Sequence, residues 1–198
     1  MQTIAKSSHK TSDTKTARNA GRNLNKSDDA IVILTSDHAK VKKLFKEFEK
    51  LSKKDDTVAK VKVANQICVE LTVHALAEEE IFYSAARRAT HADDLMNEAD
   101  VEHDSAKDLI AQIQTISPQD PMYDAKVTVL GEYINHHVKE EETEMFPKVR
   151  KTKLDLQELG MQLKMRKEEL MSKLVAINGN INVAMLKQST IDAAAKKH

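Results

Sequence analysis

Apolar residues recur every three or four positions through most of the chain, as they do along one face of an α-helix. Polar runs interrupt this periodicity at residues 52–57 and 117–121, with a softer break at residues 89–91. Between the breaks, the pattern predicts four helices, over residues 29–51, 57–88, 92–116 and from 121 to about Pro147. A further apolar stripe at Leu156, Leu159, Leu163 and Leu170 predicts a fifth helix over residues 153–174.

Residues at the expected helix ends support these boundaries. Thr90, followed three positions later by Asp93, predicts the start of the third helix. Asp120 before Pro121 predicts the start of the fourth, because proline is favoured at the first helical position. Pro147 is expected to disturb that helix, and Gly160 weakens the prediction of the fifth.

Four amphipathic helices joined by short links are typical of an up-down-up-down bundle. The predicted fold is therefore an all-α four-helix bundle over residues 28–150, with an additional C-terminal helical extension over residues 151–176. Residues 1–27 are polar and are expected to form a disordered tail, with a mitochondrial-type transit peptide as the alternative. Residues 177–198 are expected to form a frayed tail or a short helix.

Composition narrows the class of protein. The 198 residues include only 4 Gly, 3 Pro and 4% aromatic residues, too few for the turns and strands of a typical all-β fold. Lys and Arg balance Asp and Glu at 31 each, which argues against a general nucleic-acid binder. No stretch is apolar enough to span a membrane. Cys68 is the single cysteine and is expected to pack in the core, which fits a reducing compartment and predicts a cytoplasmic protein.

Six polar residues interrupt the stripes that should face the bundle core: His38, His74, Glu78, His103, His137 and Glu141. In the second and fourth helices a Glu follows a His by four positions, so both lie on one face, one turn apart. Burying such groups without compensation would cost roughly several kcal/mol per ion. Metal ions remove this cost, because imidazole and carboxylate are ligands of iron, manganese and zinc. Two glutamates on opposed helices could bridge two ions and leave positions open for water, oxygen or peroxide.

The fourth helix offers a second pair with the same spacing, His136 and Glu140. The inward apolar stripe favours His137 with Glu141, but the choice depends only on which face of the helix points inward. The other three histidines, all expected to be exposed to solvent, are His9, His91 and His198.

Four segments of the chain resemble the helices of hemerythrin-like HHE cation-binding domains. They are Thr35-Ser-Asp-His38 with Val41-Lys-Lys-Leu-Phe45, Leu71-Thr-Val-His74-Ala-Leu-Ala-Glu78-Glu-Glu-Ile-Phe82-Tyr83, Glu102-His103-Asp104, and His136-His137-Val-Lys-Glu140-Glu141-Glu142-Thr-Glu-Met-Phe146-Pro147. The resemblance covers roughly residues 30–150. It implies a four-helix bundle with two non-haem iron ions, bridged by carboxylate or oxo groups and held by the six residues named above.

The chain differs from the oxygen-carrying members of that family in its third helix. Their third helix supplies two histidines one turn apart, whereas here Lys107 follows His103 by four positions and Ala99 precedes it by four. The sequence therefore argues against reversible oxygen carriage. It predicts a cytoplasmic di-iron protein that senses, stores or turns over oxygen, peroxide or nitric oxide, without a nucleic-acid or membrane partner. The alternatives are a non-catalytic iron-binding regulatory or storage module and a metal-free helical interaction domain.

Overall fold

The computed structural model describes residues 29–54 and 56–176, and these contain helices and no β-strand. The predicted tails at 1–27 and 177–198 lie outside the described residues. In chain order the helices are α1 (Ala30–Ser52), α2 (Thr57–Ala77), η2 (Glu78–Tyr83), α3 (Ser84–Thr90), α4 (Asp93–Thr115), α5 (Met122–Glu140), η3 (Glu141–Met145), α6 (Phe146–Val149) and α7 (Leu156–Ala176). The segments η2 and η3 are π-helical.

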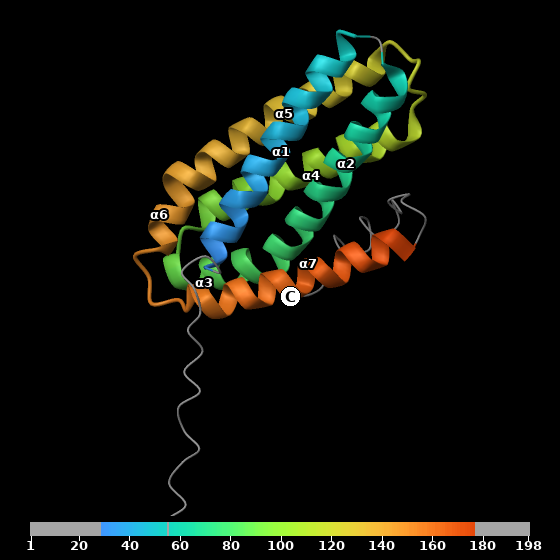
Figure 1. Cartoon of the computed structure of the whole chain (residues 1–198). Helices are drawn as coiled ribbons and strands as arrows, with labels where there is room; N and C mark the ends of the chain where they lie inside the picture. The colour runs from blue at the N-terminus through green and yellow to red at the C-terminus, as the bar shows by residue number, and fades with distance from the viewer. Residues whose placement is uncertain (1–28, 55, 177–198) are drawn as a thin grey trace, which may run out of the picture.

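Four long helical rods run up and down and enclose one core (Figure 1). The first is α1, the second is α2 continued through η2 and α3, the third is α4, and the fourth is α5 continued through η3 and α6. The predicted all-α, up-down-up-down bundle with an added C-terminal helix is therefore confirmed. The helix continues through Pro147, which falls in the first turn of α6 directly after the π-helical segment, where proline is tolerated.

Side-chain caps explain where several helices begin. Asp29 accepts a hydrogen bond of 2.8 Å from the amide of Ile31, and Asp56 accepts one of 3.0 Å from Ala59. The expected cap at Thr90 is wrong, because Ala92 is the capping residue of α4. The Thr90 hydroxyl donates to the carbonyl of Ala86 at the end of α3 and accepts from the Ala92 amide at 3.3 Å. His91 then takes a left-handed conformation, with φ of 53°, and α4 begins at Asp93.

The fourth rod also begins one residue later than predicted. Pro121 is the capping residue and α5 starts at Met122. The Asp120 side chain still accepts a hydrogen bond of 2.8 Å from the Met122 amide. It therefore caps the helix as expected, but from the position before the capping residue.

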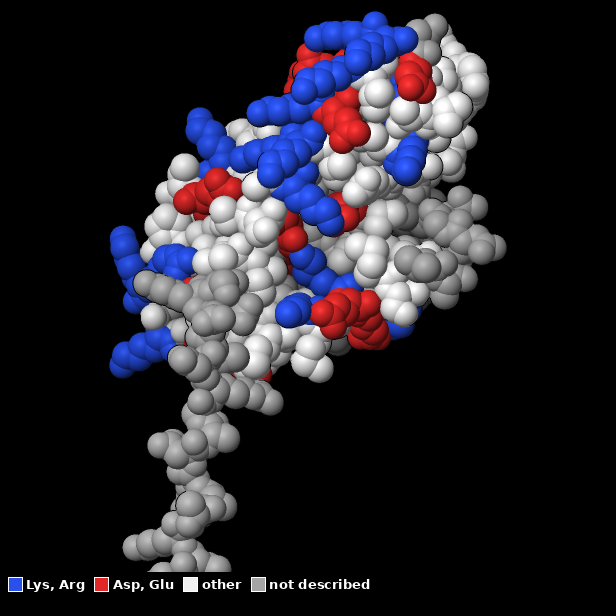
Figure 2. Space-filling model, in the orientation of Figure 1, with Lys and Arg blue, Asp and Glu red and all other residues white. Residues whose placement is uncertain are grey.

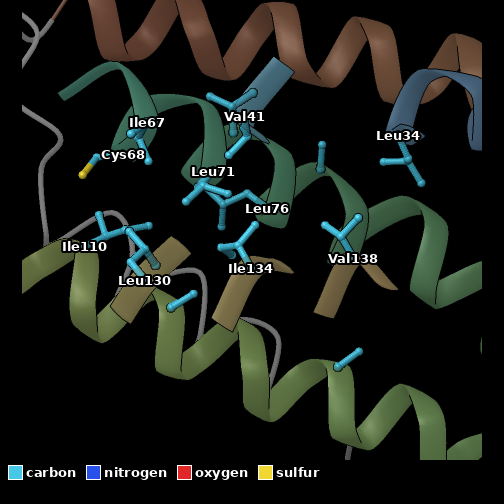
Figure 3. Packing of buried hydrophobic residues seen from close by; sticks show 14 of the residues in the cluster. Leu34, Val41, Ile67, Cys68, Leu71, Leu76, Ile110, Leu130, Ile134 and Val138 are labelled. Atoms are coloured by element: carbon cyan, nitrogen blue, oxygen red, sulfur yellow. The ribbon is translucent and has the colours of Figure 1, made fainter. Parts of the chain in front are cut away.

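Buried aliphatic side chains from all four rods fill the centre of the bundle (Figure 3). Leu34, Leu71, Ile110 and Ile134 are each no more than 7% exposed, and burying one such side chain stabilises the fold by about 1.5–3 kcal/mol. Cys68 also packs in this core, as expected. Burial raises the pKa of its thiol to about 12, so it acts as an inert apolar side chain.

The C-terminal helix α7 lies across one side of the bundle, against α1, α2 and η2 (Figure 1). Leu163 and Leu170 bury its apolar face. Its polar face forms ion pairs with the bundle: Arg166 with Glu80 at 2.7 Å, and Lys167 with Asp37. This extension therefore packs on the side of the bundle that carries His38 and His74.

The visible surface carries both signs of charge, with basic and acidic side chains interspersed (Figure 2). Among the described residues, no helix combines the length and the apolar character needed to cross a bilayer.

Candidate metal centre

The structure brings all six predicted side chains together inside the bundle. Each rod contributes one histidine, and all four are buried: His38 on α1, His74 on α2, His103 on α4 and His137 on α5. Glu78 and Glu141 are 0% and 1% exposed and are the first residues of the two π-helical segments. The folding of distant segments thus gathers ligand-type side chains that are spread over more than 100 positions of the chain.

The two π-helical segments are a feature that the sequence analysis missed. Each begins at the glutamate that follows a buried histidine by one turn, at Glu78 and at Glu141. Such segments widen the helix locally and occur frequently at functional sites. The Ser84 hydroxyl donates to the Glu79 carbonyl at 3.1 Å and so satisfies a backbone group of the widened η2 segment. The only sequence signal is that an acidic run, Glu78–Glu80 or Glu140–Glu142, accompanies each segment.

The histidines form two pairs, and each glutamate lies between the pairs. The ring centroids of His38 and His74 are 5.0 Å apart, and those of His103 and His137 are 4.6 Å apart. Glu141 Oε2 lies 3.2 Å from Nε2 of His38 and 3.4 Å from Nε2 of His137.

Glu78 repeats this arrangement with the other two histidines. Its Oε2 atom is 3.0 Å from His74 Nε2 and 3.8 Å from His103 Nε2. Two donor atoms about 2.1 Å from one ion, at right angles, would lie about 3 Å apart. The two carboxylates therefore stand where they could be shared by two ions.

Each of the four histidines directs its Nδ1 atom to a carboxylate outside the central six. The pairs are His38 with Glu142 at 2.9 Å, His74 with Asp37 at 3.3 Å, His103 with Glu79 at 2.8 Å and His137 with Glu102 at 2.8 Å. A carboxylate accepts the Nδ1 proton, so Nε2 keeps a free lone pair that faces the centre. The sequence analysis missed these four acidic residues.

Two lysines extend this outer layer. Lys107 donates to Glu79 at 2.9 Å, and Lys167 of α7 donates to Asp37. The His103 and Lys107 contacts outweigh the effect of burial and lower the pKa of Glu79, and His74 and Lys167 do the same for Asp37. Both outer carboxylates are thus held in the ionised form that accepts from a histidine. Lys107, which follows His103 by four positions, is 7% exposed.

Tyr83 completes the surroundings of the glutamates. Its hydroxyl donates to Glu141 Oε1 at 2.7 Å, and its ring is stacked on His103 at a centroid distance of 5.4 Å. Burial, together with the charges of Glu141 and Glu78, holds the pKa of Tyr83 well above its ordinary value. The phenol therefore stays protonated and orients one oxygen of Glu141, which leaves Oε2 directed at the histidines.

Unpartnered polar atoms show that this donor set fits metal cations. Both oxygens of Glu78, Oε2 of Glu141 and the Nε2 atoms of His38 and His74 are buried without a hydrogen-bond partner. The Nε2 atoms of His103 and His137 face each other at 3.0 Å, so their lone pairs would repel unless a proton or a cation lay between them. Buried polar atoms are nearly always paired, so a cluster of exceptions needs an explanation, and cations supply it.

Protons replace the cations when the site holds none. Burial alone would lower the pKa of His74, but Glu78 and Asp37 raise it to about 10. Burial alone would also raise the pKa of Glu141, but His137 and His38 hold it well below the ordinary range. The carboxyl group of Glu141 is therefore ionised, and a cation that binds here must displace the proton of His74.

A small cavity lies directly beside the histidines, on the side away from the glutamates. Its volume is about 20 Å³, enough for a guest of the size of a water molecule. The four histidines and Lys107 line it together with apolar side chains such as Leu71, Ile110 and Ile134. A small molecule in this cavity would lie beside the Nε2 atoms of the histidines, and most of the other side chains around it are apolar.

The competing pair of the fourth helix points outward. His136 is 62% exposed, and its Nε2 lies 3.3 Å from Glu140 Oε1. His137 is 3% exposed and faces the centre. Of the histidines expected to be exposed, His91 is exposed, whereas His9 and His198 lie outside the described residues.

Together, the bundle and its buried histidines and carboxylates define a metal-binding helical-bundle protein. The family model of the hemerythrin HHE cation-binding domain matches residues 29–149, more than half of the chain. The chain therefore belongs to this family of cation-binding domains, and the resemblance noted from its motifs is confirmed.

Two individual proteins are similar to this chain. A crystal structure of a hemerythrin HHE cation-binding domain-containing protein from Mycobacterium kansasii matches with a TM-score of 0.62 and 22% identity, over 75% of this chain and 90% of that one. A protein named DNA nickase from Nostoc sp. (strain PCC 7120) is 34% identical over 118 residues, which are 60% of this chain and 32% of that protein. The chain thus spans about a third of the length of this relative.

Proposed function

We propose that the protein is a non-haem di-iron protein that senses, stores or turns over a small oxidant: oxygen, peroxide or nitric oxide. The observation that carries the proposal is the pair of buried glutamates, with both oxygens of Glu78 and Oε2 of Glu141 lacking a hydrogen-bond partner, between two pairs of histidines whose Nε2 atoms face inward. Two iron ions would supply redox equivalents and binding positions for the oxidant. Zinc and manganese suit the same ligand types and are the alternative metals.

The proposed ligands form two groups, one for each of two metal ions. The inward atoms of His38, His74 and Glu141 lie within 4.8 Å of one another, and so do those of Glu78, His103 and His137. Because each glutamate also contacts a histidine of the opposite pair, both carboxylates could be shared by the two ions. Two histidines and two shared carboxylates would leave each position with vacancies, which would favour reaction with small molecules over a closed structural site.

The protein's own residues prepare the cavity for a small oxidant. Its apolar wall excludes bulk water, so only a small guest of low polarity enters at low cost. Lys107 lines the same cavity and remains fixed by Glu79, 2.7 Å from its Nζ atom. The ammonium group can therefore stabilise negative charge that develops on the guest or give it a proton.

A second candidate function is a non-catalytic iron-binding regulatory or storage module. The specific observation in its favour is the contact between α7 and the site, through Lys167, Asp37 and His74. Metal occupancy would then change how firmly the C-terminal helix is held. The DNA nickase relative is matched over only about a third of its length, so the similarity transfers no nicking activity to this chain.

Metal analysis combined with a turnover assay tests the proposal. Purified protein should bind about two iron ions per chain, and the iron-loaded form should consume peroxide faster than the same protein loaded with redox-inert zinc. Two bound iron ions without turnover would favour the regulatory module. A protein that binds no metal would overturn both functions and leave the metal-free interaction domain.

A further inference from the structure

We propose that Glu102, His136 and Glu140 form an acceptance site for a divalent cation on the outer face of α4 and α5, from which the cation passes to the buried centre. The inference rests on the proposed function, because it describes how that centre is filled. His136 Nε2 lies 3.3 Å from Glu140 Oε1 and 3.7 Å from Glu102 Oε1. These three donor atoms lie within 4.8 Å of one another, a separation that a single ion can span.

The acceptance site differs from the buried centre in its access to solvent. His136 is 62% exposed, Glu140 30% and Glu102 22%. A hydrated cation can therefore reach these groups without first losing its water shell, unlike at the buried glutamates. Two carboxylates and one imidazole carry net negative charge and include the ligand types that bind Fe²⁺, Mn²⁺ and Zn²⁺.

Glu102 connects the outer site to the inner one. Its Oε1 atom faces His136, while its Oε2 atom accepts the Nδ1 proton of His137 at 2.8 Å. The same carboxylate thus contributes to the exposed cluster and orients a proposed ligand of the centre. A cation held at Oε1 lies one side chain away from His137.

A small cavity leads from this carboxylate toward the centre. Its volume is about 10 Å³, and Glu102, Glu140, His137 and Glu141 all line it. Glu141 is 1% exposed and leaves Oε2 without a hydrogen-bond partner. Carboxylates of Glu102, Glu140 and Glu141 therefore border one cavity between the surface and the buried site, together with the apolar side chains of Leu95, Ala99 and Met145. The carboxylate oxygens lower the cost of moving a partly dehydrated cation inward.

The direction of transfer follows from the two donor sets. The outer site offers three donors that are open to water, whereas the inner positions offer buried histidines and two buried carboxylates that contact histidines of both pairs. A cation is held more firmly where it has more ligands and less competition from water. The acceptance site should therefore affect how fast the centre fills but not how much metal it holds at equilibrium.

Loading kinetics test this inference. Metal-free full-length protein is mixed with Co²⁺ under argon, and the visible absorption of bound Co²⁺ is followed for wild type and for the double variant H136A/E140Q. We expect the same final absorption, reached at least about tenfold more slowly, since removing a steering cluster of charge slows association by that order. The matched control is Glu132→Gln, which removes an exposed carboxylate from the same helix but lies outside the cluster.

Each outcome decides the question. Loading of the double variant within twofold of the wild-type rate would overturn the acceptance site, and so would equal slowing in Glu132→Gln. A lower final absorption in the double variant would show that His136 and Glu140 are ligands of the centre itself, which also overturns it. Absence of Co²⁺ binding in wild type would instead contradict the proposed metal centre, so the two failures are distinguishable.

Direct binding provides the second test. In protein already loaded with Zn²⁺, added Mn²⁺ does not displace zinc from the centre, because zinc binds such ligands more strongly. Mn²⁺ should therefore broaden the imidazole proton signals of His136 in the NMR spectrum, and Glu140→Gln should reduce this broadening severalfold. Unbroadened His136 signals at millimolar Mn²⁺ would overturn the proposal.

Discussion

At the residue scale, the centre is built from adjacent pairs of side chains. In each pair one residue points into the site, and the residue next to it in the chain accepts a hydrogen bond from a histidine of another helix. The four pairs are Asp37 with His38, Glu78 with Glu79, Glu102 with His103, and Glu141 with Glu142. Successive residues of a helix are about 100° apart, so the neighbour of an inward residue faces the adjacent helix. One short motif thereby supplies both a proposed ligand and a support for a different ligand.

The choice between His137 and His136 can be tested by exchanging each for alanine. His137→Ala should lower the equilibrium metal content to about half or less, because it removes a buried proposed ligand. His136→Ala, the matched control, should keep nearly all of the metal. Elemental analysis of the two purified variants decides between them. The opposite ranking would mean that Glu140 rather than Glu141 belongs to the centre.

The proposed bridging role predicts that both ions depend on each glutamate. Glu78→Ala and Glu141→Ala should each lose both ions together, since each carboxylate contacts histidines of both pairs. A variant of the outer layer, Glu142→Ala, should keep substantially more metal because it supports only His38. Iron counts per chain provide the measurement, and one ion retained in either bridging variant would contradict the assignment.

At the scale of whole elements, α7 is more than a cover for the bundle. Its Lys167 fixes Asp37, which in turn fixes His74. The predicted C-terminal extension therefore contacts the surroundings of the centre. It does so although it lies more than 80 positions beyond His74 in the chain. The π-helical segments belong to the same scale, because each begins at a glutamate that contacts a histidine of another helix.

Lys167→Met should weaken metal binding by up to about tenfold, the lower end of the effect of removing a direct partner of a metal ligand, because Lys167 acts on His74 through Asp37. The apolar stem remains, so packing of α7 changes little. Lys164→Met removes an exposed lysine of the same helix and should have little effect. Competition with a chelator of known affinity measures the difference. Equal affinity in Lys167→Met and wild type would show that α7 does not influence the site, whereas rescue by Lys167→Arg would support the role.

At the scale of the whole molecule, metal should tighten the bundle without being required for its helices. Removing the metal leaves two buried carboxylates without the cations that would compensate their burial. At a free metal concentration about 100 times the dissociation constant, binding adds about 2.7 kcal/mol, equivalent to a rise of roughly 5–10 °C in the melting temperature. Far-ultraviolet circular dichroism should still show helix in the chelated protein. An unchanged melting temperature after verified metal removal would contradict this expectation.

The iron-loaded protein should react with oxygen without carrying it reversibly. The third rod supplies one buried histidine, His103, with Ala99 and Lys107 one turn before and after it, so at least one position would keep a vacancy for reaction. Reduced protein exposed to air should be oxidised and should not return under argon. Repeated cycles between the two gases are followed by visible absorption. A spectrum that appears in oxygen and disappears in argon over many cycles would identify a carrier.

The sequence by itself determined the helices and the inward residues. Apolar periodicity marks the face of each helix, and His38, His74, His103 and His137 interrupt that periodicity at core positions. The pattern is local, since it depends only on the 3.6-residue repeat of a single helix. For this reason the bundle and the additional C-terminal helix were predictable, as was the outward face of His136.

Only the tertiary structure decided how the helices meet. Which carboxylate supports which histidine depends on the rotation and height of two packed helices, as with Asp37 of α1 and His74 of α2. The approach of Lys167 depends on where α7 crosses the bundle. The widened turns likewise begin at Glu78 and Glu141, two buried residues that contact histidines of other helices. These features join segments distant in the chain, and no repeat within one helix encodes them.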